Sequence, residues 1–242
     1  MHSTPRSYVA DQFQFLNTPC ILAVAAGMMI GASYSLFVEG CTFVEEGDVT
    51  DISSEVRTAI GALLGLVFIL GTKQFLEKYE DLHVGELGGA DARRALLILF
   101  VMTLHSFSEG VGIGVSFGGS HGSELGVFIS ASLAVHNVPE GLAIAVVLLP
   151  KKISKLTAAL WAIMTSVPQP LMAVPAFLFV QYFIPILPVG LGFAGGAMAW
   201  VAIFELLLEA YEDTDMVTTG VVSSISLGCI LFLQGAIDGR TV

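Results

Sequence analysis

The chain has 242 residues, of which 55% are hydrophobic and only 13% are charged, and its mean hydropathy is +0.81. A soluble domain of this length carries about a quarter charged residues, so the composition predicts an integral membrane protein. The net charge of −11, with only 10 Lys and Arg residues, excludes a surface that follows a phosphate backbone, and we expect no nucleic-acid partner.

Seven apolar segments are long enough to cross a bilayer as helices, which takes about 20 residues each. We therefore expect an all-α fold, a polytopic membrane helix bundle, with residues 1–242 forming a single transmembrane domain. Pro168, Pro170 and Pro175 interrupt the fifth segment and predict a kink there. The seven segments lie near residues 18–38, 57–76, 95–117, 124–148, 154–182, 186–209 and 215–235.

The basic residues predict how the bundle is oriented, because cytoplasmic loops are enriched in Lys and Arg. One side carries two basic residues, Arg57 and Arg240, whereas the other side carries eight. This bias predicts an N-terminus inside and a C-terminus outside, in either the plasma membrane or an organelle membrane. The other side, formed by the N-terminal end and the loops after the second, fourth and sixth segments, carries Arg6, Lys73, Lys78, Arg93, Arg94, Lys151, Lys152 and Lys155.

Two related motifs, HSFSEG from His105 and HNVPEG from His136, lie near the middle of the third and fourth segments. Each places a glutamate four residues after a histidine, so His105 and Glu109 share one helix face, as do His136 and Glu140. Ionisable groups at the bilayer midplane are costly unless they are paired, hydrated or bound, which favours a functional role. Two imidazoles and two carboxylates suit Zn²⁺ or a similar dication, and the absence of a thiolate favours a site that releases its metal.

Two alternatives compete with a metal site. A single intramembrane histidine or glutamate is also accounted for by a hydrogen bond across helices or by a buried neutral acid, but two pairs at one depth favour binding. An intramembrane metalloenzyme is the less favoured alternative. The HxxxE spacing differs both from HExxH, which carries a general base, and from the ExxH pair of di-iron bundles. We therefore expect no enzyme.

At these residues the sequence resembles the Zrt/Irt-like (ZIP) family of divalent-metal transporters. Its overall residue pattern is similar to that of the plant and algal branch. HSFSEGVGIG and HNVPEGLAIA match the paired family motifs, and TSVPQPLMAVPAF and GFAGGAMAWVAIFELLLEA match the two following core helices. GMMIGASYSLF is similar to a helix near the family's start, so the resemblance covers roughly residues 20–235. The family usually has eight spans, and the seven counted here lack a counterpart of the first.

The resemblance implies transport of Zn²⁺, or of Fe²⁺ or Mn²⁺, towards the cytoplasm, by alternating access or by an elevator motion of the core helices. It also implies that His105, Glu109, His136 and Glu140 hold one metal ion. Members that hold a second ion use positions that correspond here to three neutral residues. We therefore expect one tightly held ion, with these residues as weak or outer partners: Ser106, Asn137 and Gln169.

Further acidic and histidine residues lie near segment ends. Glu205 and Glu209 are candidates for an inner exit route, and Glu39 and His121 are candidates for metal uptake from outside. Solvated helix ends account for polar residues at these positions as well.

An alternative function is a non-transporting subunit of a larger membrane assembly, in which His105 or His136 ligates a pigment or haem. The expected partners are thus a divalent metal ion, the lipid bilayer, and a second copy of the chain or a membrane assembly.

Overall fold

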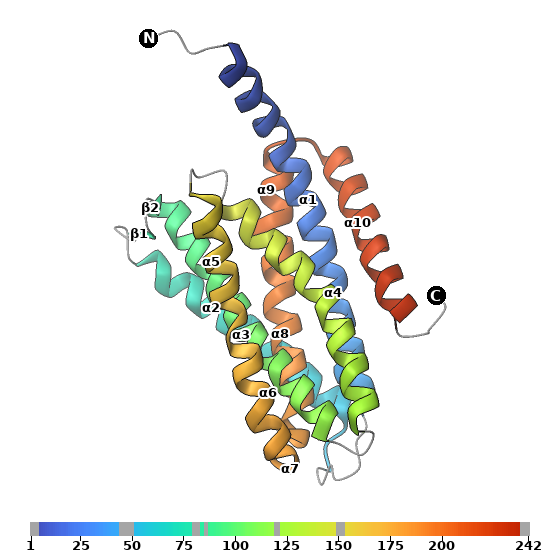
Figure 1. Cartoon of the computed structure of the whole chain (residues 1–242). Coiled ribbons are helices and arrows are strands. Elements are labelled where there is room, and N and C mark those ends of the chain that lie inside the picture. Colours follow the sequence, from blue (N-terminus) through green and yellow to red (C-terminus); the bar gives the residue numbers. More distant parts are fainter. Residues whose placement is uncertain are drawn as a thin grey trace.

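Figure 1 shows the computed structural model of the chain, which describes residues 5–43, 51–78, 83–84, 87–118, 122–148 and 153–237. At some of these positions, among them residues 5–18 and His136, only the backbone is described. Long helices dominate, and the strands among the described residues form one short antiparallel hairpin that pairs His83 with Gly88 and Val84 with Leu87. The all-α helix bundle predicted from composition is confirmed.

The helices and strands follow one another in chain order. The first part comprises α1 (Pro5–Thr42), α2 (Ser54–Glu77), β1 (His83–Val84), β2 (Leu87–Gly88), α3 (Gly89–Gly118) and α4 (Gly122–Leu148). The second part comprises α5 (Lys155–Ser166), α6 (Pro168–Leu178), α7 (Val180–Phe183), the 3-10 turn η2 (Ile184–Ile186), α8 (Leu187–Trp200), the π-helix η3 (Val201–Leu207), α9 (Leu208–Glu212) and α10 (Met216–Ile237).

Among the described residues, seven helical stretches are long and apolar enough to cross a membrane, as the sequence predicted. The fifth stretch is interrupted beside its prolines: α5 ends at Ser166, α6 begins at Pro168, and Val167 lies between them with helical dihedral angles. The stretches are Pro19–Thr42, Ser54–Glu77, Ala92–Gly118, Ile129–Leu148, Lys155–Leu178, Val180–Glu212 and Met216–Ala236.

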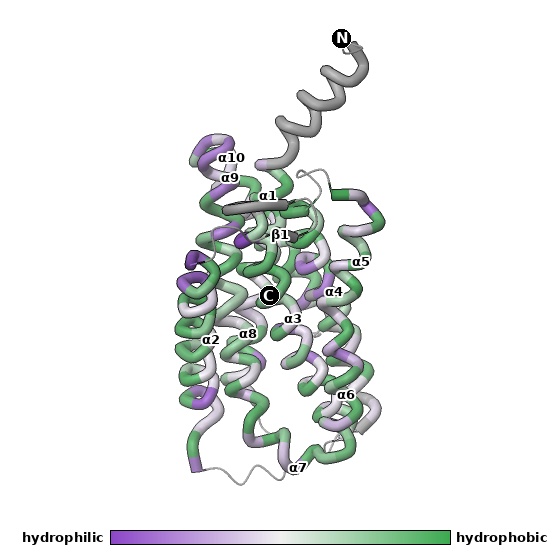
Figure 2. The backbone as a smooth tube through the Cα atoms, turned by 90° about the vertical axis from the view of Figure 1, so that its left-hand side faces the viewer, coloured by the Kyte–Doolittle hydropathy of each residue, from purple (hydrophilic) through white to green (hydrophobic). Residues whose placement is uncertain are grey.

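Successive helices run in alternating directions, so their connections gather at two ends of the bundle. The hairpin of β1 and β2, the start of α5 and the end of α9 lie at one end, at the top of Figure 1, which we call the hairpin end. The α7 turn lies at the opposite end, together with the end of α3 and the start of α4. The hydropathy colouring in Figure 2 shows long apolar stretches along the helices between these two ends.

The helices pack as two groups. In the first group α2 packs extensively on α8, and α1 packs on α8 and α10; in the second, α3 packs on α4, α5 and α6. Figure 2 shows α2 and α8 on one side and α4, α5 and α6 on the other. The groups meet where α3 contacts α8 and α2, and where α1 contacts α4. The helix that carries His105 and Glu109 thus lies at the boundary between the two groups.

Small residues allow α2 and α8 to approach closely. A methyl group added to Gly65 would collide with the main-chain carbonyl of Phe193, and one added to Gly192 would collide with that of Thr58. Since lipid tails are as apolar as leucine, helices in membranes associate largely through such close packing. The α2–α8 pair therefore depends on glycine at these positions.

We predict that Gly65→Ala lowers the midpoint of thermal unfolding in detergent, because the added methyl overpacks this contact at a cost of about 1–3 kcal/mol. Gly71→Ala on the same helix is the matched control, since its methyl would enter open space. The midpoint of each variant is measured as the temperature at which half of the monodisperse size-exclusion peak is lost on heating. Equal midpoints for the two variants would contradict the packing argument.

Candidate metal centre

His105 and Glu109 are presented by α3, which is unbroken from Gly89 to Gly118. Both side chains are buried, and one helical turn separates them, as the i, i+4 spacing predicted. Ser108, between them in the motif, donates its hydroxyl to the main-chain carbonyls of Leu104 and His105, at 3.2 Å and 3.1 Å. The hydroxyl is thus satisfied within the helix and leaves the two neighbouring side chains available for other contacts.

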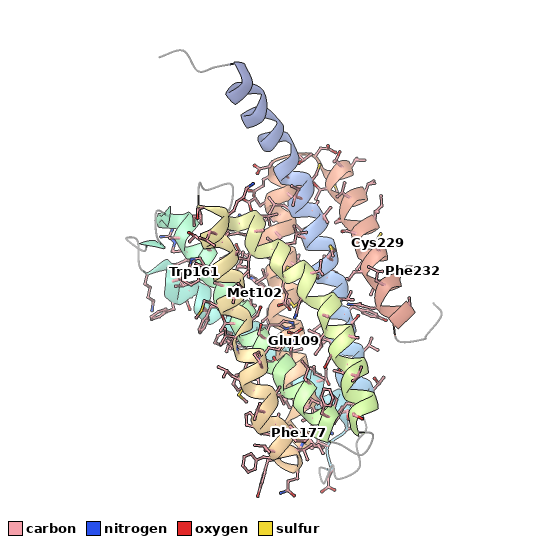
Figure 3. The ribbon with its side chains drawn as sticks, in the orientation of Figure 1. Met102, Glu109, Trp161, Phe177, Cys229 and Phe232 are labelled. Carbon is pink, nitrogen blue, oxygen red and sulfur yellow. The ribbon has the colours of Figure 1, made fainter. Side chains whose placement is uncertain are left out.

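Glu140 reaches the same point from α4. The Nε2 atom of His105 lies 2.7 Å from Oε1 of Glu140 and 3.4 Å from Oε1 of Glu109. All three side chains are buried, and each offers one ligand atom within 4.8 Å of the others. Figure 3 labels Glu109 near the middle of the bundle, between Met102 towards the hairpin end and Phe177 towards the opposite end. One histidine and two carboxylates from two helices thus converge in the interior.

The spacing of these atoms fits a small dication. A tetrahedral zinc ion with bonds of about 2.1 Å holds its ligand atoms roughly 3.4 Å apart, which matches the distance from His105 to Glu109. The 2.7 Å approach of His105 to Glu140 is shorter, so a bound ion would move these two groups apart. Both nitrogens of His105 and Oε1 of Glu140 lack an aligned hydrogen-bond partner among the described residues. Poorly satisfied buried polar atoms are costly, and a metal ion would satisfy one nitrogen of His105 together with Oε1 of Glu140.

Asn137 lines a cavity together with Glu140 and interacts with Gln169. Nδ2 of Asn137 donates to Oε1 of Gln169 at 3.3 Å, which joins α4 to the first turn of α6. Oδ1 of Asn137 is buried and has no hydrogen-bond partner in the described part of the chain. An open cavity of about 450 Å³ adjoins them and is lined by Asn137, Glu140, Gly141, Ile144, Ala162, Ile163, Thr165, Ser166, Val167 and Pro170. The flank of the site on the α6 side therefore carries amides rather than charges.

The other predicted residues fall into three situations. Ser106 is buried on α3 directly after His105, and Glu39 is half-buried three residues before the end of α1. His136 lies within α4, but its side chain is outside the described part, so its role as a ligand stays a prediction. His121 lies outside the described residues altogether.

Glu205 and Glu209 lie near the hairpin end in ion pairs that the sequence analysis did not foresee. Glu205 is 2.9 Å from Nζ of Lys73, and Glu209 pairs with the guanidinium of Arg94. Arg94 also lies 3.8 Å from the carboxylate of Glu205 and donates to its main-chain carbonyl. Sequence reasoning used Lys73 and Arg94 only as markers of orientation. One feature of the sequence could have indicated a further role for Arg94: it lies about three helical turns before His105, on the same face of the helix.

Comparison with known proteins agrees with this geometry. The sequence profile of the ZIP zinc transporters matches residues 80–233 of the chain. The chain belongs to the ZIP family. It is 33% identical over 205 residues to the zinc transporter GufA of Myxococcus xanthus, which covers 83% of the chain and 80% of that protein. It is 31% identical over 224 residues to the zinc transporter ZIPB of Bordetella bronchiseptica, which covers 90% of the chain and 71% of that protein.

A plant relative extends the comparison. An Arabidopsis thaliana protein named as a candidate zinc transporter is 43% identical over 218 residues, which are 90% of the chain and 34% of the relative. The chain thus spans about a third of the length of this relative. Proteins of the ZIP family are membrane transporters rather than enzymes, so the family resemblance and the expectation of no enzyme are both confirmed.

We predict that His105→Ala and Glu140→Gln each weaken zinc binding by at least about 100-fold. Removing an outer partner of a ligand already costs about 10- to 100-fold in metal affinity, and these residues would contact the ion. Isothermal titration of the purified protein in detergent measures the affinity. Glu212→Gln, an exposed carboxylate at the end of α9, is the control and should bind zinc as the unaltered chain does. Equal affinities for all four proteins would contradict the assignment.

Proposed function

We propose that the chain transports a divalent transition metal ion, most readily Zn²⁺, through a midplane site formed by His105, Glu109, His136 and Glu140. The observation that carries this proposal is the buried convergence of His105, Glu109 and Glu140. Membership of the ZIP family and the zinc transporters among the relatives support it. His136 would be the fourth ligand, because it precedes Glu140 by one turn of the continuous helix α4.

The donor types favour zinc over the other candidate metals. Imidazole nitrogen and carboxylate oxygen bind Zn²⁺, Fe²⁺ and Mn²⁺, and the affinity of a given site rises from manganese through iron to zinc. Fe²⁺ and Mn²⁺ would therefore bind to the same ligands as further substrates, and we expect them to bind more weakly than Zn²⁺.

Charge balance explains why such a site can hold an ion at membrane depth. The two carboxylates of Glu109 and Glu140 carry two negative charges, and neutral imidazoles add ligand atoms without charge. A bound dication therefore gives a site with no net charge, which lowers the cost of placing it in a low-dielectric environment. A motion of the helices around the neutral occupied site would then carry the ion across by alternating access.

The direction we propose is towards the hairpin end, which we take as the inner, cytoplasmic end. At this end lie five basic residues whose side chains are described, whereas the opposite end has Arg57, which donates to the main-chain carbonyl of Pro185. An excess of Lys and Arg marks cytoplasmic loops. The five are Lys73, Lys78, Arg93, Arg94 and Lys155.

We predict Zn²⁺ uptake into proteoliposomes at a rate well above that of empty vesicles, driven by a zinc gradient. His136→Ala and Glu140→Ala should reduce the flux to the background, because each removes a direct ligand. A zinc-sensitive dye inside the vesicles measures the flux, and protease access to tags on the two termini measures the orientation.

Glu212→Ala serves as the control for this assay and should retain full flux. If the folded, unaltered chain gave no flux above empty vesicles, transport would be overturned in favour of a non-transporting membrane subunit. A pigment or haem copurifying with the chain and lost in His105→Ala would support that alternative.

A second proposal concerns the number of ions. Ser106, Asn137 and Gln169 are neutral, so a second dication would share Glu140 as its main negative ligand and leave the site with a net positive charge. We predict one tightly bound zinc ion per chain by titration calorimetry. Asn137→Asp, which adds a carboxylate beside Glu140, should add a second binding event. Two equally tight ions in the unaltered chain would exclude the single-ion site.

A further inference from the structure

The geometry points to an ion-pair lock at the inner end of the bundle, in which Arg94 and Lys73 bind Glu205 and Glu209 and hold the route from the metal site closed. The lock rests on the proposed transport function, because it controls access to the site proposed above. It gives Arg94 a role in the transport cycle beyond that of a positive charge in a cytoplasmic loop.

The lock joins helices of both packing groups. Lys73 belongs to α2, Glu205 to η3 and Glu209 to α9, whereas Arg94 belongs to α3, which packs on α4, α5 and α6. Arg94 contacts both carboxylates and the main-chain carbonyl of Glu205. A single side chain of the site-bearing helix is thus held at three points by the opposite group.

Arg94 lies directly in line with the metal site along α3. About three helical turns, roughly 16 Å, separate it from His105, and the two positions fall on nearly the same face of the helix. Val101 lies between them on this face and is buried. An ion that travels from His105 to the inner end along this face of α3 would therefore meet the guanidinium of Arg94.

The partner segment has an unusual backbone at the same place. Residues Val201–Leu207 form a π-helix, a rare conformation that occurs frequently at functional sites in other proteins. Glu205 lies within this segment, and its carbonyl oxygen accepts the hydrogen bond from Arg94. The local widening of the helix therefore occurs where the lock engages.

The charges and burial of the lock favour a reversible closure. Two cations face two carboxylates, so the closed arrangement is electrically balanced. Exposed fractions of the side chains run from 11% for Glu205 and 20% for Arg94 to 40% for Lys73, so water reaches part of the cluster. A cavity of about 150 Å³, lined in part by Lys73, Arg94 and Glu205, adjoins it. Partly exposed ion pairs are weak enough to open during a transport cycle.

Cysteine accessibility tests the lock without any transported metal. Cys20, Cys41 and Cys229 are first replaced by serine, and Val101→Cys then reports on the path between Arg94 and His105. A membrane-impermeant thiol reagent is applied to the inner face of proteoliposomes in the presence of a chelator. Arg94→Gln should raise the labelling rate of this cysteine by about tenfold, the population change that corresponds to about 1.4 kcal/mol.

Three controls separate opening of the lock from other effects. Lys155→Gln removes a positive charge at the same end, outside the cluster, and should leave the rate unchanged. Val115→Cys, buried on α3 beyond the metal site, should not gain inner-side labelling in the Arg94→Gln background, whereas general loosening would expose it. Glu209→Gln tests the same pair from the other helix and should speed labelling of Val101→Cys, even if Arg94→Gln does not fold.

The outcomes distinguish this inference from the proposed function. Equal labelling of Val101→Cys in the Arg94→Gln, Glu209→Gln and Lys155→Gln backgrounds would overturn the lock, whatever the flux. Faster labelling in the first two backgrounds would support it. A chain that shows this acceleration but gives no metal flux would overturn transport while leaving the ion-pair closure in place.

Discussion

The cost of placing ionisable groups inside an apolar, lipid-facing bundle is the constraint on which the rest of this structure depends. The chain meets it in two ways. Near the hairpin end, Arg94 and its partners neutralise one another within the protein. In the middle, His105 and Glu140 approach each other, yet their facing atoms have no aligned hydrogen bond among the described residues. A dication would compensate this group more fully, because two carboxylates balance its charge.

Much of this arrangement follows from sequence alone. Apolar length predicted the seven spans, three prolines predicted an irregularity in the fifth span, and the i, i+4 rule predicted that His105 and Glu109 share a face. The convergence of Glu140 followed from a short connection between two antiparallel helices. The ion pairs of Arg94 could not be predicted in this way. They depend on the register between α3 and η3, which tertiary packing and a local π-helix set, whereas helical periodicity does not.

The neutral flank of the site bears on how many ions it can hold. Asn137 and Gln169 use one donor and one acceptor on each other, so part of their bonding capacity is already committed to joining α4 to α6. Carboxylates in these positions would repel each other unless an ion lay between them. Amides remain stable together without metal. The amide pair therefore needs no second ion, which supports the proposal of a single bound dication.

The continuity of α3 determines whether a movement of Arg94 is transmitted along the helix to His105. Arg94 and His105 share one continuous helix, and Ser108 lies where a proline would remove a helical hydrogen bond and introduce a kink. The Ser108 hydroxyl instead bonds to carbonyls of its own turn. An unkinked helix transmits displacement along its length, whereas a kinked one absorbs it by bending. In the proposed lock, release of Arg94 from η3 and α9 would therefore shift His105 and Glu109 with it, which would couple opening of the hairpin end to movement of the proposed ligands.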